Sequence, residues 1–96
     1  MPKYARVATF EADDAAIDAL LAEISAGGGP PEGLPAKRLT VLADRAAGTL
    51  VVSVRFDSEE DLHKGTEVLN AMSPPAGGNI RRVSVGAYEI VFDQEA

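Results

Sequence analysis

The segment that most constrains the fold is TLVVSVRF, residues 49–56, near the middle of the chain. Alternate residues of a strand point to opposite faces of a sheet. One face of this segment carries only leucine, valine and phenylalanine, and the other mixes threonine, valine, serine and arginine. Neither face has the composition of a fully solvated surface. We therefore expect both faces of the sheet to be covered, one by helices and the other by something else.

A second strand and a tight turn come directly before this segment. Residues 37–44, KRLTVLAD, have the β-branched and apolar composition of a strand. In the connecting DRAAG, Asp44 can start a turn and Gly48 can adopt a positive φ. The sequence therefore predicts a hairpin, with Arg45 exposed in its turn.

Two amphipathic helices are predicted, one before the hairpin and one after it. Asp13 and Asp14 open the first helix, and either carboxylate can cap it. The second helix starts in DSEEDL, residues 57–62, where Ser58 and Asp61 resemble a capping box. Apolar residues recur at helical spacing in both segments. The expected buried residues are Ile17, Leu20, Leu21 and Ile24 in the first helix and Leu62, Thr66, Leu69 and Met72 in the second, with Gly65 allowing close approach.

Two further strands, residues 3–11 and 80–92, complete the pattern. The order β-α-β-β-α-β predicts a ferredoxin-like α+β fold, in which an antiparallel sheet carries two helices on one face. The chain has 96 residues, and we expect one domain spanning residues 1–96. Because the helices cover only one face, the mixed-to-apolar other face is expected to pack against a second copy, giving a homodimer through the sheet.

Charge and composition exclude several classes of function. The chain has 15 acidic and 9 basic residues, a net charge of −6, which disfavours nucleic acid and anionic membranes as partners. It has no cysteine, which excludes disulfides and zinc–sulfur sites. No apolar run is long enough for a signal peptide or a transmembrane helix. We therefore expect a soluble, cytoplasmic protein.

The glycine-rich and acidic segments lack the features of phosphate and calcium sites. GGGPPEG, residues 27–33, follows a helix rather than a strand and lacks the Gly-Lys-Ser/Thr ending of a phosphate loop. The acidic segment 57–61 lacks the glycine and terminal glutamate of a calcium loop, and it suits a helix N-terminus. We expect no metal and no cofactor. Residues 25–36 are interpreted as a plain connector, with a lid as the alternative.

His63 is the only histidine and the candidate catalytic base. At helical spacing it aligns with Glu67, which could orient the ring, and with Asn70, which could steer a ligand. The alternative is an exposed pair that stabilises the helix by a few tenths of a kcal/mol, about the usual size of such an effect. We favour this alternative, because the sequence shows no metal or nucleophile partner for the ring.

Other candidates for ligand contacts lie on the strands and in the core. Three of them could bind an anionic or phenolic group if they point into a pocket: Arg6, Arg55 and Tyr88. Their alternative roles are ion pairs between strands or subunits for the arginines and a half-buried anchor for the tyrosine. The apolar candidates, which also suit ordinary core positions, are Phe10, Phe56 and Met72.

Three stretches together carry a resemblance to a known family: YARVATFE, VLADRAAGTLVVSVRFDSEEDL and VGAYEIVF. They resemble the dimeric α/β-barrel superfamily and, within it, the antibiotic biosynthesis monooxygenase-like proteins. The resemblance covers nearly the whole chain. It implies a dimer whose two sheets face each other as a barrel, with a pocket between the helices and the sheet of each subunit. Catalytic members of the family oxidise quinol-like aromatic compounds without metal or flavin.

The chain departs from the catalytic members at one informative position. Those members often have tryptophan at the end of the third strand, where this chain has Phe56, and a polar residue on the same strand face, which here is apolar. Two functions are therefore considered. The first is a non-catalytic binding or accessory protein with an apolar pocket between helices and sheet. The second is a cofactor-free monooxygenase-like enzyme for a small aromatic substrate, with His63 or Arg55 handling protons or charge. The two departures from the catalytic members favour the non-catalytic binding or accessory protein.

Overall fold

Four strands and two helices follow one another in the predicted order. The computed structural model describes residues 3–27, 33–71 and 79–94. Its elements are β1 (Lys3–Ala12), α1 (Asp14–Gly27), β2 (Arg38–Asp44), β3 (Thr49–Phe56), α2 (Glu59–Ala71) and β4 (Ile80–Ile90). The ferredoxin-like α+β prediction is confirmed.

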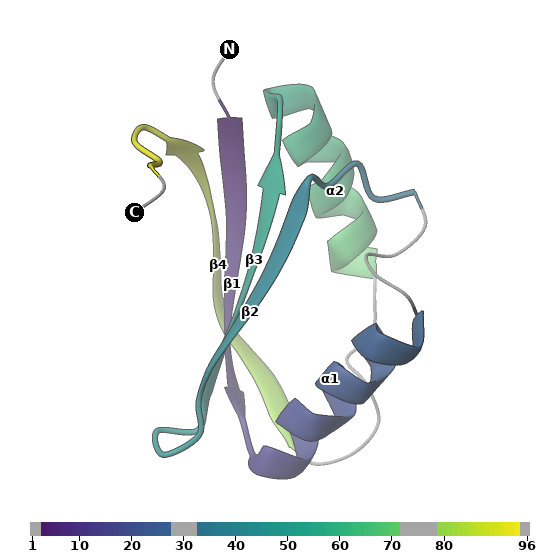
Figure 1. Cartoon of the computed structure of the whole chain (residues 1–96), viewed down its shortest axis with the longest axis vertical. Coiled ribbons are helices and arrows are strands. Elements are labelled where there is room, and N and C mark those ends of the chain that lie inside the picture. Colours follow the sequence, from purple (N-terminus) through teal and green to yellow (C-terminus); the bar gives the residue numbers. More distant parts are fainter. Residues whose placement is uncertain (1–2, 28–32, 72–78, 95–96) are drawn as a thin grey trace.

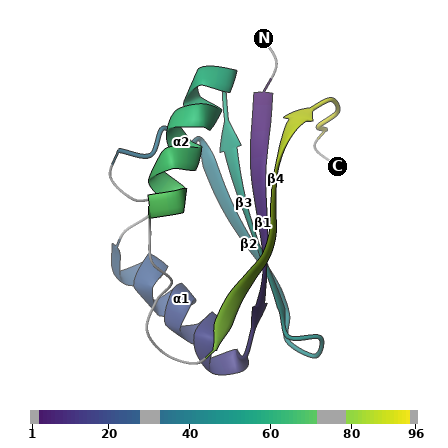
Figure 2. The same ribbon diagram turned by 180° about the vertical axis from the view of Figure 1, so that it is seen from behind.

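The strands form one antiparallel sheet in the order β2-β3-β1-β4. Both helices lie on the same face of this sheet (Figures 1 and 2). Residues that pair across neighbouring strands share a face. Tyr4 pairs with Phe56, Arg6 with Val54 and Phe10 with Leu50, so these side chains all point toward the helices.

The core lies between the sheet and the helices, in two clusters. One consists of Ala12, Ala16, Ile17 and Leu50 and packs under α1. The other consists of Val54, Phe56 and Leu62 and packs under α2. The apolar face predicted for β3 is therefore the helix-facing side. The prediction for Leu21 is wrong, because its side chain is 41% exposed.

Side-chain caps fix where both helices begin. Asp13, one residue before α1, accepts a hydrogen bond at Oδ1 from the backbone nitrogen of Ala16, at 2.8 Å. Of the two predicted caps, Asp13 is therefore the one used. Ser58, directly before α2, accepts at Oγ from the backbone nitrogen of Asp61, at 3.1 Å. Both helices start where a short polar side chain can satisfy a free backbone N–H.

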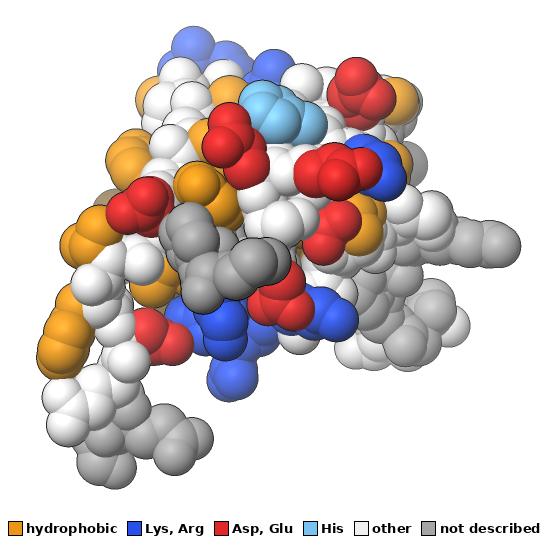
Figure 3. Space-filling model, turned by 90° about the horizontal axis from the view of Figure 1, so that it is seen from above, with side chains coloured by type: hydrophobic (Ala, Val, Ile, Leu, Met, Phe, Trp, Pro, Cys, Tyr) orange, Lys and Arg blue, Asp and Glu red, His pale blue; other side chains and the backbone are white. Residues whose placement is uncertain are grey.

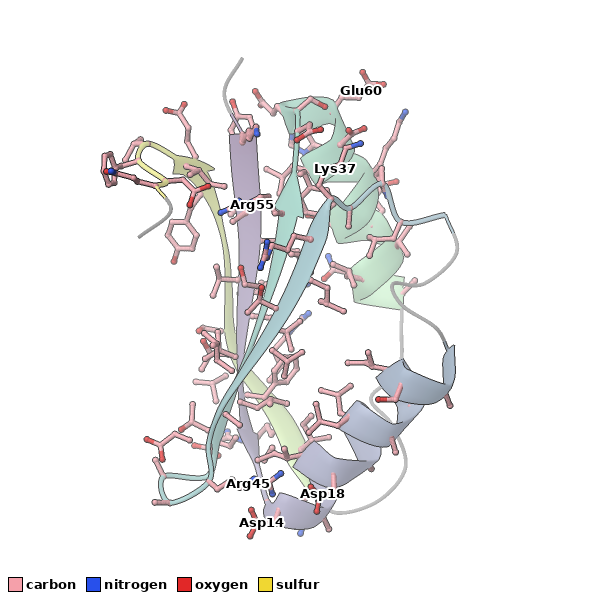
Figure 4. The ribbon with its side chains drawn as sticks, in the orientation of Figure 1. Asp14, Asp18, Lys37, Arg45, Arg55 and Glu60 are labelled. Atoms are coloured by element: carbon pink, nitrogen blue, oxygen red, sulfur yellow. The ribbon has the colours of Figure 1, made fainter. Side chains whose placement is uncertain are left out.

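The predicted turn between β2 and β3 is present and is tied to α1. Asp44 Oδ1 accepts from the backbone nitrogen of Ala47 at 3.1 Å, and Gly48 has a φ of 68°. Arg45 is exposed, as predicted, but it also reaches Asp14 at 2.9 Å and Asp18 at 2.8 Å (Figure 4). The turn thereby holds the first turns of α1 against the end of the sheet.

Three strand boundaries differ from the sequence prediction: β1 ends at Ala12 rather than at residue 11, β2 begins at Arg38 rather than at residue 37, and the end of β4 also differs. β4 ends at Ile90 rather than at residue 92, and the two apolar residues that follow, Val91 and Phe92, are 85% and 79% exposed. β1 pairs with β4 through a register shift between Thr9 and Phe10. Residues 28–32 of the predicted connector, and Met72, lie outside the described residues.

Candidate functional site

The polar group that stands out on the helix-facing side of the sheet is Arg6. It lies on β1 with Val54 opposite on β3 and Ala87 opposite on β4. The alternation of β1 turns Arg6 to the same side as Tyr4, toward the helices. The residue is only 5% exposed, although a guanidinium group is costly to remove from water.

Arg6 and Arg82 meet at one amide on α2. Asn70 Oδ1 accepts from Arg6 Nη2 at 2.9 Å and from Arg82 Nη1 at 3.2 Å. Arg82 reaches the same place from β4, where it pairs with Phe10 on the helix-facing side. Two positive charges therefore share one neutral oxygen. We call Arg6, Asn70 and Arg82 the arginine–amide cluster.

The charge of this cluster is not balanced by the carboxylates of the described residues. None of the ion pairs formed within residues 3–27, 33–71 and 79–94 includes Arg6 or Arg82. Acidic residues outnumber basic ones by 15 to 9, so this is not for lack of acids in the chain. Burial, followed by the nearby Arg82 charge, lowers the pKa of Arg6 from its ordinary value.

One nitrogen of Arg6 has no partner at all. Within the part of the chain that the structure describes, Nε of Arg6 is the only buried side-chain nitrogen or oxygen without a hydrogen bond. Such groups are rare in folded proteins, and each needs an explanation. The cluster therefore holds donors, net positive charge and one buried N–H without a partner among the described residues.

The predicted apolar residues Phe10 and Phe56 lie on this same side but are enclosed by packing. Phe56 is fully buried, and a Cβ added at Gly65 of α2 would overlap carbons of its ring. Leu34 closes the other side, 3.3 Å from that Cβ position. Phe10 packs against the cluster under α1. The space under Phe56, where the sequence placed a pocket, is therefore filled by the chain's own side chains.

His63 lies on the outside of α2. Its side chain is 73% exposed, and its Nε2 is 3.5 Å from Oε1 of Glu59, one turn earlier in the helix. Figure 3 shows the histidine at the surface among acidic side chains. The structure does not bring His63 together with Asn70, which faces the arginines. The predicted partner Glu67 forms no ion pair with His63 among the described residues.

The remaining predicted residues, Arg55 and Tyr88, lie on the face of the sheet that is turned away from the helices. Arg55 pairs with Asp93 beyond the end of β4, at 3.0 Å, and points away from the helices (Figure 4). Tyr88 is 59% exposed, and its ring lies over Gly86. The predicted ligand residues are thus divided between the two faces, and only Asn70 joins Arg6.

Sequence reasoning missed Arg82. The signal was present in the doublet Arg81-Arg82, because adjacent residues of a strand point to opposite faces. Arg81 turns to the far face and pairs with Glu11 at 2.6 Å, while Arg82 turns to the helix side. Which arginine faces the helices depends on the register between β1 and β4, which the sequence alone does not show.

The far face of the sheet is not covered by either helix (Figure 2). Its centre has apolar and small side chains, among them Ala5, Val7, Leu42, Val51, Ser53 and Tyr88. Its rim carries charges of both signs at each end: Lys3, Arg38 and the pair Arg55–Asp93 at one end, and Asp44 and the pair Glu11–Arg81 at the other. An apolar centre with a charged rim is the usual anatomy of a protein–protein interface.

The structure also has an open depression of about 650 Å³ at the end of the sheet far from Phe56. It is lined by Glu11, Ala12, Asp13, Ala47, Gly48, Asn79, Ile80 and Arg81. Its charged side chains already bond to neighbours, Arg81 to Glu11 and Asp13 to Asn79. The depression therefore offers a ligand fewer free polar groups than the arginine–amide cluster does.

The described part of the chain shows neither a metal site nor a membrane-spanning helix. Across residues 3–27, 33–71 and 79–94, no group of three or more His, Cys, Asp or Glu side chains is arranged to hold a metal ion. Of the helices that the structure describes, neither has the length and apolar character needed to cross a bilayer.

Comparison with known proteins identifies the fold. No protein-family model matches the sequence, and no curated protein matches it. Among solved structures, the chain matches a protein of Chloroflexus aurantiacus J-10-fl that is described provisionally as an antibiotic biosynthesis monooxygenase. The match covers 97% of each chain at 15% identity, with a TM-score of 0.61. The chain shares the fold of that protein.

This fold is the one that the sequence resemblance implied, so the resemblance is confirmed at the level of the fold. One fold can host many functions, and the activity must be argued from the residues of the site. In this chain the ferredoxin-like fold holds the arginine–amide cluster on the helix side and an uncovered apolar face on the other side.

Proposed function

We propose that this protein is a homodimeric small-molecule binding protein without catalytic activity. The ligand lies between α2 and the sheet, beside Arg6, and the far faces of two sheets form the dimer. The observation that carries the binding proposal is the burial of Arg6 with an unpartnered Nε. A folding role does not explain this arrangement, because a buried charge without a carboxylate lowers stability.

The side chains near the proposed ligand position support binding rather than catalysis. The guanidinium groups of Arg6 and Arg82 can only donate hydrogen bonds, and Asn70 is a neutral amide. His63, the only histidine of the sequence, is exposed on the outside of α2. The described cluster thus provides donors and charge, but it contains no general base and no nucleophile.

The proposed dimer follows from the far face of the sheet. Four strands about 4.8 Å apart and about 27 Å long give a projected area of roughly 500 Å², to which side-chain relief adds. A stable interface buries about 800 Å² per partner, so side-chain relief and the residues at the rim have to supply the remaining area. A two-fold axis relates the two faces, and the charges of both signs on each rim can then pair across the interface.

One experiment distinguishes a binding protein from an enzyme. The full chain is titrated by calorimetry with small aromatic compounds, and oxygen uptake is followed with the same compounds and with a panel of hydroquinones. We expect binding heat and no oxygen uptake above the background rate. Turnover that His63→Ala abolishes and Lys64→Ala leaves intact would contradict the proposal, as would an absence of binding by every compound.

The second candidate is a cofactor-free monooxygenase-like enzyme for a small quinol-like substrate. Its support is the shared fold with the Chloroflexus aurantiacus protein and the earlier sequence resemblance. In such a reaction His63 or Arg55 would have to reach the substrate, and the two residues lie on the outside of α2 and on the far face of the sheet. We therefore rank this candidate second.

A further inference from the structure

We propose that the arginine–amide cluster binds the carboxylate of a small ligand that has an apolar body. Arg6 and Arg82 would both donate to the carboxylate oxygens from the helix-facing side of the sheet. This inference rests on the proposed function, because it names the chemical class of ligand for the same position.

The two arginines of the cluster have hydrogen-bond donors that the described residues do not use. A guanidinium group has five N–H donors in a planar fork. Among the described residues, Arg6 donates one side-chain hydrogen bond, from Nη2 to Asn70, and Arg82 donates one, from Nη1 to the same oxygen. The buried Nε of Arg6 has no hydrogen-bond partner in this part of the chain. A bound ligand with several acceptor atoms would satisfy these donors together.

The arginine–amide cluster carries two positive charges that lie close together. Two guanidinium groups within hydrogen-bond distance of one oxygen repel each other, and the neutral amide between them compensates little of this repulsion. A ligand that carries a negative charge removes the repulsion and gains charge-assisted hydrogen bonds. A carboxylate also matches the planar fork of a guanidinium group, so that two parallel bonds can form.

The side chains next to Arg6 in the sheet are small or apolar. Arg6 lies between Val54 and Ala87 in the sheet, and the helix side of β4 continues with Val85, which is 44% exposed. The helices contact β1 and β3 more than β4. The helix side of β4 presents Val85 and Ala87 next to Arg6, with Arg82 and Glu89 on either side of them. A ligand entering over Val85 and Ala87 would meet apolar side chains before reaching Arg6, which favours a carboxylate with an apolar body.

The test uses benzoate and benzamide, which have the same shape but differ in charge. Both are titrated by calorimetry into the full chain at constant ionic strength. Two variants are compared: Arg82→Gln, which removes an exposed member of the cluster, and Arg81→Gln, which removes the adjacent arginine on the far face. Both positions are exposed, and circular dichroism verifies that each variant folds.

We expect benzoate to bind about tenfold or more tightly than benzamide, since only benzoate carries a negative charge and offers two equivalent acceptor oxygens to the guanidinium groups. Arg82→Gln is expected to weaken benzoate binding several-fold and to leave benzamide binding unchanged. Arg81→Gln should leave the binding of both compounds unchanged, because we attribute benzoate binding to the arginine–amide cluster and not to the net charge of the protein.

Three results would overturn the inference. Equal binding of benzoate and benzamide would reject the carboxylate and leave the proposed binding function standing. Equal loss in Arg81→Gln and Arg82→Gln would show that overall charge, not the cluster, attracts benzoate. Absence of binding by both compounds would overturn the inference together with the proposed function at this position.

Discussion

At the scale of single residues, the contact between Phe56 and Gly65 decides what can lie under α2. The Phe56 ring is fully buried, and Gly65 gives it room that a methyl group would take. Position 56 is where catalytic relatives in the resembled family often have tryptophan. A larger ring there would need space that the close approach of α2 has already removed.

The substitution Gly65→Ala tests this packing. Overpacking costs about 1–3 kcal/mol and the better helix propensity of alanine returns up to about 1 kcal/mol. We therefore expect the free energy of unfolding to fall by about 1–2 kcal/mol in denaturant titrations. In the background of Phe56→Leu the loss should shrink, because the ring is gone. An equal loss in both backgrounds would show that the two residues do not interact.

Arg6 allows a prediction that separates function from stability. Replacing an uncompensated buried charge by an apolar side chain of similar length is neutral or stabilising. We expect Arg6→Met to raise the free energy of unfolding of the ligand-free protein by about 1 kcal/mol and to abolish benzoate binding. Arg82→Met, at an exposed position, should change stability little. A clear destabilisation by Arg6→Met would mean that Arg6 serves the fold.

The sequence predicted residue positions well where strand alternation sufficed. It placed Leu50, Val54 and Phe56 correctly on one side of β3. It could not predict which arginines meet, because Arg6, Asn70 and Arg82 are brought together by the pairing of β1 with β4 and the docking of α2. These contacts join residues far apart in the chain, and local periodicity does not carry that information.

At the scale of elements, Asp13 connects the start of α1 with the segment that enters β4. Its Oδ1 accepts from the backbone nitrogen of Ala16, and its Oδ2 accepts from the backbone nitrogen of Asn79 at 3.0 Å. Hydrogen bonds from Ala16 and then Asn79 lower the pKa of Asp13 from its ordinary value of 3.8. The charged form is therefore the one that the folded protein favours.

This pKa shift predicts how stability depends on pH. Because the folded-state pKa is the lower one, the stabilisation is fully present above the unfolded-state value of 3.8 and is lost as pH falls through the folded-state value. We expect Asp13→Ser, which can still cap the helix, to reduce the loss of thermal stability between neutral and acidic pH. An acid-induced loss equal to that of the wild type would exclude Asp13 as a contributor.

The existence and order of the helices and strands could be predicted from the sequence. Their first and last residues were harder to predict. The caps at Asp13 and Ser58 and the turn at Gly48 have local sequence signals. β4 stops at Ile90 although the apolar pattern continues through Val91 and Phe92, because β1, its partner, begins at Lys3 opposite Ile90. A strand ends when its partner ends, and this depends on register.

At the scale of the whole molecule, the sheet has two faces with different roles. The helices and the arginine–amide cluster lie on one face, and an apolar centre with a charged rim forms the other. If the far face joins a second copy, placing a charge in it should dissociate the dimer without disturbing the helix side.

We expect Leu42→Lys to convert the protein to a monomer in light scattering at micromolar concentration, with a mass near the 10.0 kDa of one chain. Leu42 is 56% exposed in the single chain, so the monomer should remain folded. Leu21→Lys is the matched control, since Leu21 is an exposed leucine on α1. A wild-type mass of 10.0 kDa would refute the dimer, and equal behaviour of the two variants would refute this interface.

The central claim is that the ligand lies on the helix side of the sheet, beside Arg6. The most direct measurement is a nuclear magnetic resonance titration of the isotope-labelled protein with benzoate, which follows backbone amides and the arginine Nε–H signals together. We predict that the largest shifts occur at Arg6, Asn70 and Arg82, with the Arg6 Nε–H signal among them. Shifts centred on Leu42 and Val51 of the far face, or no shifts at all, would contradict the claim.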